Sequence, residues 1–62
     1  MLRFEYNPNY YQVVDEEGAF IGTIKKTVHH SRMYCFFPES NVFLTKELTQ
    51  IVDKLKELNN EK

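Results

Sequence analysis

The segment from Leu44 to Asn59 carries the strongest periodic pattern in this chain. Its apolar residues recur three or four positions apart, at Leu44, Leu48, Ile51, Val52, Leu55 and Leu58. This spacing places them in one stripe along an α-helix. Because the stripe must be buried, the residues before it have to supply the covering surface. The pattern therefore predicts a helix at about 45–59, packed on a layer formed by the rest of the chain.

Four shorter segments before the predicted helix are typical of strands, at about 2–6, 10–15, 19–26 and 33–37. They alternate polar with apolar residues, or are rich in β-branched and aromatic ones. Turns are indicated at Pro8 and at Gly18, which can take a positive φ. The sequence thus predicts one α+β domain over 1–62: a three- or four-stranded antiparallel β-meander with one C-terminal α-helix packed on one sheet face (βββα or ββββα).

The hairpin around Gly18 also predicts which sheet face the helix covers. With residues 16–18 as the loop, the pairs are Val14–Phe20, Val13–Ile21, Gln12–Gly22, Tyr11–Thr23 and Tyr10–Ile24. Alternation then gives one face the larger apolar area, from Tyr10, Val14, Phe20 and Ile24. We expect the helix on that face, with Gly22 allowing its close approach. A bulge elsewhere in the hairpin would exchange the two faces.

A single helix leaves the opposite face of such a sheet uncovered. Exposed apolar residues on a sheet face are typical of a surface that binds a partner. We expect this protein-interaction face to consist of Tyr11, Val13, Ile21, Tyr34 and Phe36. An alternative use of the same face is homodimerisation, which would enlarge the small core of a 62-residue domain.

The charge distribution indicates a second kind of partner. The whole chain has a net charge of −1, but residues 24–34 carry three basic residues and no acidic one. Basic side chains beside an aromatic one can contact phosphate and stack on a base. A nucleic-acid-binding βββα domain using the basic connection 25–34 is therefore the alternative function. Its contact residues would be Lys25, Lys26, Arg32 and Tyr34.

No residue pattern indicates catalysis, a cofactor or a metal. His29 and His30 are adjacent, so on an extended chain they point in opposite directions, and we expect a solvated turn there. Cys35 lies between aromatic residues on a predicted strand, which favours a buried, unreactive thiol. The two glycines, Gly18 and Gly22, fit no nucleotide-binding fingerprint. We expect a protein that is not an enzyme, without catalytic, cofactor-binding or metal-ligating residues.

The composition favours the cytoplasm as the location. The start, MLRFEYNPN, lacks the basic and apolar regions of a signal peptide, and no apolar run is long enough to span a membrane. The single cysteine cannot form an intramolecular disulfide. A protein of a reducing compartment, not inserted in a membrane, is expected.

The chain resembles small phage- or prophage-encoded proteins that pair a short β-meander with one C-terminal helix. The segments that carry this resemblance are GAFIGTIKK, YCFFPES and LTKELTQIVDKLKELN. This resemblance implies a small accessory protein that binds and modulates a host protein, as a regulatory or anti-defence factor. The element order is also similar to the DNA-binding domains of plant ethylene-response factors and to integrase arm-binding domains. Those domains read DNA with arginines and a tryptophan on the sheet face opposite the helix. This sequence has only Arg3 and Arg32 and no tryptophan, so protein binding is the first expectation.

Overall fold

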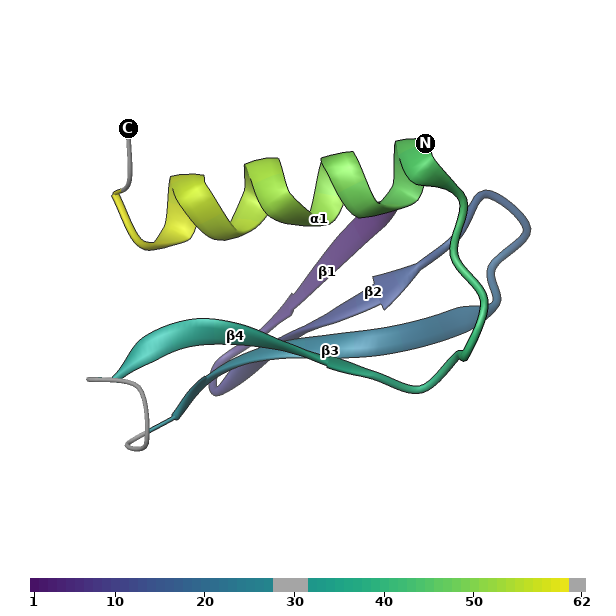
Figure 1. Ribbon diagram of the computed structural model, residues 1–62. Helices are drawn as coiled ribbons and strands as arrows, with labels where there is room; N and C mark the ends of the chain where they lie inside the picture. Colours follow the sequence, from purple (N-terminus) through teal and green to yellow (C-terminus); the bar gives the residue numbers. More distant parts are fainter. Residues whose placement is uncertain (28–31, 61–62) are drawn as a thin grey trace.

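The computed structural model describes residues 1–27 and 32–60, which form four strands and one helix (Figure 1). The strands are β1 (Arg3–Asn7), β2 (Tyr10–Val14), β3 (Phe20–Thr27) and β4 (Met33–Pro38), and α1 spans Thr45–Leu58. Each strand pairs antiparallel with the next, in the order β1-β2-β3-β4. α1 lies on one face of this sheet (Figure 1). The predicted β-meander of three or four strands with a C-terminal helix is confirmed, and the number of strands is four.

The turn between β2 and β3 forms as its sequence predicts. Gly18 has a φ of +87° and donates its N–H to the Asp15 carbonyl at 3.0 Å. The Asp15 N–H donates to the Ala19 carbonyl, also at 3.0 Å. The Asp15 carboxylate accepts hydrogen bonds from the backbone N–H groups of Glu17 and Ala19 at 2.9 Å. The acidic residue at the start of the turn thus stabilises the turn itself.

Beyond the turn, a β-bulge changes the register of β3 against β2. Val14 pairs with Phe20, as predicted, but Val13 pairs with Gly22, so Ile21 is an extra residue in β3. Side chains alternate between the faces of a sheet, and one extra residue therefore exchanges the faces of everything beyond it. The predicted pairs of Val13, Gln12 and Tyr11 are wrong by one position, and the predicted Tyr10–Ile24 pair is wrong because Ile24 pairs with Tyr11.

The bulge decides what α1 covers. The core between helix and sheet is Leu2, Val13, Ile21, Ile24 and Ile51, with Val13 and Ile24 both 0% exposed. Of the predicted covered set, only Ile24 belongs to this cluster; Val14 is buried outside it at 7% exposure, Tyr10 is partly buried and Phe20 is exposed. The physical reason is that Ile21 and Ile24 are three residues apart, so strict alternation would send them to opposite faces. With the bulge, both are buried against the helix.

The bulge also supplies a hydrogen-bond acceptor for the segment that connects β4 to the helix. The Ile21 carbonyl accepts hydrogen bonds from the backbone N–H groups of Glu39 at 2.9 Å and Ser40 at 3.3 Å. A regular strand would direct successive carbonyls to its neighbouring strands in a fixed alternation. The irregular residue therefore anchors the start of the segment that leads to α1.

Gly22 is needed for close packing within the sheet, and not under the helix as predicted. A Cβ atom at Gly22 would lie 2.5 Å from Phe36 Cε1 and 2.8 Å from the Phe37 carbonyl oxygen. The Phe36 ring thus lies directly over the Gly22 backbone, and its other contacts include the Phe43 ring, edge-on with centroids 5.8 Å apart. The close approach permitted by this glycine is that of β4.

The helix begins at Thr45, where its start is predicted, and Leu44 is its N-cap residue. Leu44 has extended torsions, φ −78° and ψ 152°, and its N–H donates to Glu47 Oε1 at 2.9 Å. The carboxylate in the first turn supplies the capping interaction, and its charge also suits the positive end of the helix dipole.

Two polar side chains, from Gln50 of α1 and from its C-cap residue Asn59, bind the two edges of the sheet. Gln50 Oε1 accepts the N–H of Leu2, immediately before β1, at 2.8 Å. Asn59 Oδ1 accepts the Tyr34 N–H at 2.8 Å, and Asn59 Nδ2 donates to the Tyr34 carbonyl at 3.1 Å. The Asn59 amide thus binds Tyr34 of β4 as a residue of a neighbouring strand would.

Replacing Asn59 by alanine is expected to lower the free energy of unfolding by about 1–2 kcal/mol, because two part-buried hydrogen bonds to Tyr34 are lost. Urea denaturation followed by circular dichroism measures the change. Asn60→Gly is the matched control, since Asn60 has a φ of +57° that glycine adopts without strain. Equal stability of the Asn59→Ala and wild-type chains would contradict a role for this amide in holding β4.

Candidate functional site

The five residues predicted to form an exposed interaction face lie beneath α1 instead. Val13 is fully buried and Ile21 is 7% exposed, and Tyr11, Tyr34 and Phe36 are partly buried and pack against the core. Tyr11 and Tyr34 meet edge-on, with ring centroids 6.0 Å apart. The prediction that this set is an accessible face is wrong, because the bulge at Ile21 exchanged the two faces.

The opposite face of the sheet is the one without a covering layer. No helix or strand formed by residues 1–27 and 32–60 lies over it (Figure 1). Its three most exposed large apolar side chains are Phe20 at 46%, Phe37 at 39% and Met33 at 38%. Strand alternation and the pairing assign to it, from β1 to β4, Arg3, Glu5, Asn7, Tyr10, Gln12, Val14, Phe20, Thr23, Lys25, Thr27, Met33, Cys35 and Phe37. Of these, Val14 is buried, at 7% exposure. We call these residues the uncovered face.

The uncovered face has a small positive charge beside its aromatic residues. Lys25 Nζ lies 4.7 Å from the centroid of the Phe37 ring. Arg3 and Glu5 are within 3.7 Å of each other and offset one another. Among the described residues no carboxylate pairs with Lys25. The uncovered face is therefore an apolar surface with one cation, Lys25, that can pair with a carboxylate of a partner.

The structure does not bring the predicted nucleic-acid residues together. Lys25 belongs to the uncovered face, whereas Lys26 lies beside Tyr34 on the helix side, its Nζ 5.3 Å from the ring centroid. Arg32 has a φ of +62° in the turn before β4 and is exposed. Lys25 and Lys26 therefore point away from each other, and the four side chains share no single surface.

Residues considered for metal or thiol chemistry form no site in the described part of the chain. His29 and His30 lie outside the described residues. Within residues 1–27 and 32–60, no three His, Cys, Asp or Glu side chains are grouped to hold a metal ion. Cys35 is half-buried on the uncovered face, and not buried as predicted, with Sγ 3.6 Å from the Met33 carbonyl oxygen. The described helix is neither long nor apolar enough to cross a membrane.

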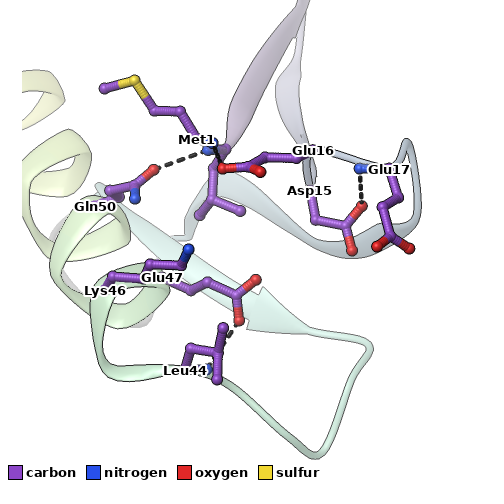
Figure 2. Close-up of a pocket in the computed structure, with 9 residues that line it drawn as sticks. Met1, Asp15, Glu16, Glu17, Leu44, Lys46, Glu47 and Gln50 are labelled. Carbon is purple, nitrogen blue, oxygen red and sulfur yellow. Dashed lines mark hydrogen bonds and ion pairs between the residues drawn. The ribbon is translucent and has the colours of Figure 1, made fainter.

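A hollow of about 260 Å³ lies between the β2–β3 turn and the first turns of α1 (Figure 2). Three of its four carboxylates have structural partners: Glu16 pairs with the amino group of Met1, Asp15 accepts backbone N–H groups of its own turn, and Glu47 accepts the Leu44 N–H. A second hollow of about 320 Å³ adjoins it along β1 and includes Phe4 and Lys54. Both hollows include Met1 and Leu2, which precede β1, and only the second reaches β1 itself, at Phe4.

A second exposed apolar surface lies on the flank of α1 that faces β4. Leu44, Leu48 and Val52 are spaced four residues apart and are about half exposed. Asn59, on the same flank of the helical wheel, binds the β4 edge, whereas Gln50 on the other flank binds the β1 side. The sheet thus covers only part of the apolar stripe.

The sequence contains a signal for the true uncovered face that strict alternation hides. Phe20 and Ile21 are adjacent and both apolar, and Ile24 follows Ile21 by three positions. Only an inserted residue brings Ile21 and Ile24 to one face and leaves Phe20 on the other. No protein-family model, no curated protein sequence and no solved structure matches this chain.

Proposed function

We propose that this protein is a non-catalytic interaction module that binds another protein through its uncovered face. The observation that supports this proposal is the exposure of Phe20, Met33 and Phe37 together on a sheet face with no layer over it. Aromatic and methionine side chains are enriched in the centres of protein interfaces. Half-exposed aromatic residues are also the type that contributes most binding energy when a partner covers them.

The chemistry of the face favours a partner that presents an apolar surface with a carboxylate. Two copies stacked face to face would bring their Lys25 side chains onto one another's positively charged face, which is unfavourable. A partner carboxylate would instead meet Lys25 where it lies over Phe37. An amphipathic helix is a suitable shape for the partner surface, since the other face of the same sheet already packs against the amphipathic helix α1.

A host protein as the partner, and a regulatory effect on it, complete the proposal. They are supported by the resemblance of the β-meander and helix segments to small phage-encoded proteins. A cytoplasmic location belongs to the same proposal, and the single cysteine supports it.

The proposal is tested by site-specific photo-crosslinking from Thr23, which lies on the uncovered face between Gln12 and Phe37 in the pairing. In cells of the organism that produces this protein, we expect a crosslinker at position 23 to capture one partner protein reproducibly. A crosslinker at exposed Asp53 on α1 should not capture it. The captured protein is then purified and its affinity for this chain is measured by calorimetry.

Replacing Phe20 and Phe37 by serine is expected to weaken this binding at least about tenfold, since two exposed aromatic contacts are removed. Lys25→Glu should weaken it as well. The matched control is Leu44→Ser with Leu48→Ser, which removes apolar side chains of similar exposure from the helix flank. The proposal is wrong if the Phe20→Ser, Phe37→Ser chain remains folded and binds the partner with wild-type affinity.

A further inference from the structure

The two edges of the sheet differ in how well they are protected from another strand. On β4, the outward N–H and C=O of Tyr34 are both taken by Asn59, and Pro38 has no N–H to donate. Only Phe36 remains between them with free outward groups. Protection of this kind is what natural proteins use to prevent edge-to-edge pairing. On the β1 side, the helix takes only the N–H of Leu2, through Gln50.

β1 presents an open row of backbone hydrogen-bonding groups. Leu2 donates its N–H away from the sheet, to Gln50, so alternation turns the N–H and C=O groups of Phe4 and Tyr6 outward too. Among the described residues no group outside the sheet binds them. The Tyr6 side chain is 68% exposed at the same edge. β1 therefore has the geometry for adding a strand.

The sequence of β1 is complementary to itself in one antiparallel register. With Phe4 opposite Phe4 of a second copy, Arg3 faces Glu5 of that copy, and Glu5 faces its Arg3. Two opposite-charge cross-strand pairs result. Centring on Glu5 would oppose two carboxylates, and centring on Tyr6 would place Pro8, which has no N–H, opposite Phe4. One register avoids both penalties.

We propose that two copies of this chain associate by antiparallel pairing of β1 with β1, centred on Phe4. The pairing joins two four-stranded sheets into one sheet of eight strands. Outward groups of Phe4, Tyr6 and the Leu2 carbonyl form about four hydrogen bonds while the Leu2 N–H stays on Gln50. The two-fold axis is perpendicular to the sheet, so both helices lie on one side, and the two uncovered faces become continuous on the other.

Charge exchange at Arg3 and Glu5 tests this pairing with the chain alone, so its result is independent of the proposed partner. Sedimentation equilibrium is run from about 10 μM to about 1 mM, since interfaces below the standard size associate weakly. We expect the wild type to dimerise. Arg3→Glu and Glu5→Arg chains, each measured alone, should dissociate about tenfold more readily, because both cross-strand pairs become like-charged.

Two complementary samples distinguish this register from a general charge effect. The Arg3→Glu chain mixed with the Glu5→Arg chain should form a heterodimer, because every pair is again of opposite charge, and the Arg3→Glu, Glu5→Arg double variant should recover wild-type association. In the wild type, the Phe4 and Tyr6 amides should become protected from hydrogen exchange as concentration rises. A wild type that is monomeric throughout, or a dimer unaffected by the single exchanges while the variants remain folded by circular dichroism, overturns the proposal.

Discussion

The Gly22→Ala chain is expected to lose about 3 kcal/mol or more of its free energy of unfolding. The added Cβ would lie 2.5 Å from Phe36 Cε1 and 2.8 Å from the Phe37 carbonyl oxygen, both well inside van der Waals contact. The carbonyl belongs to the backbone of β4, and the Phe36 ring is held between Gly22 and Phe43. Neither can move without opening the sheet or the core, so the overlap cannot be relieved locally.

A loss of this size is close to the whole stability of such a chain, which for 62 residues is roughly 3–9 kcal/mol. We therefore expect a largely unfolded protein by circular dichroism at 25 °C, or a much lower urea midpoint. Gly18→Ala is the matched control. Its Cβ would meet only Arg3 Nη2 at 4.0 Å, so its cost is the positive φ, about 1 kcal/mol. Wild-type stability of Gly22→Ala would contradict the close approach of β4 to β3.

Replacing Ile21 by aspartate is expected to unfold the chain, whereas replacing its neighbour Phe20 by aspartate is not. Ile21 is 7% exposed within the core, and burying a carboxylate there without a partner costs at least about 4 kcal/mol. Phe20 is 46% exposed on the uncovered face, where a carboxylate remains hydrated and the expected loss is below about 1 kcal/mol.

The two variants are compared by thermal unfolding and by the dispersion of their amide proton spectra. The regular register that the alternation predicts would give the opposite result, with Phe20 covered by the helix and Ile21 accessible. A folded Ile21→Asp chain together with an unfolded Phe20→Asp chain would therefore support that regular register and contradict the bulge. The pair thus tests the feature on which both the uncovered face and the proposed function depend.

Most of the architecture could be read from local patterns. The apolar spacing from Leu44 to Leu58 predicts the helix, because a helix of this length needs only one stripe to pack. Pro8 and Gly18 predict their turns through their own torsional preferences, without help from distant residues. The strand limits agree with the predicted ones to within about one residue, the ordinary uncertainty of element ends.

The candidate site could not be predicted in the same way. Tyr11, Val13 and Ile21 were expected at a surface because a hairpin without a bulge has a fixed alternation from its turn onward. One inserted residue reverses that alternation, and the local sequence tolerates both arrangements. The residues that the structure leaves accessible, Phe20 and Phe37, are apolar and so fit a core as well as an interface.

The amino-acid pattern alone therefore determines four strands, their turns and one helix, since each of these depends on neighbours within a few residues. Tertiary packing decides which sheet face that helix covers. The bulge at Ile21 is favoured by contacts far away in sequence: burial of Ile21 and Ile24 against Ile51, and a carbonyl that receives the N–H groups of Glu39 and Ser40. Because side chains in a strand have a period of two, these long-range contacts reverse the two faces of the sheet. They place Phe20, Met33 and Phe37 where a partner can reach them.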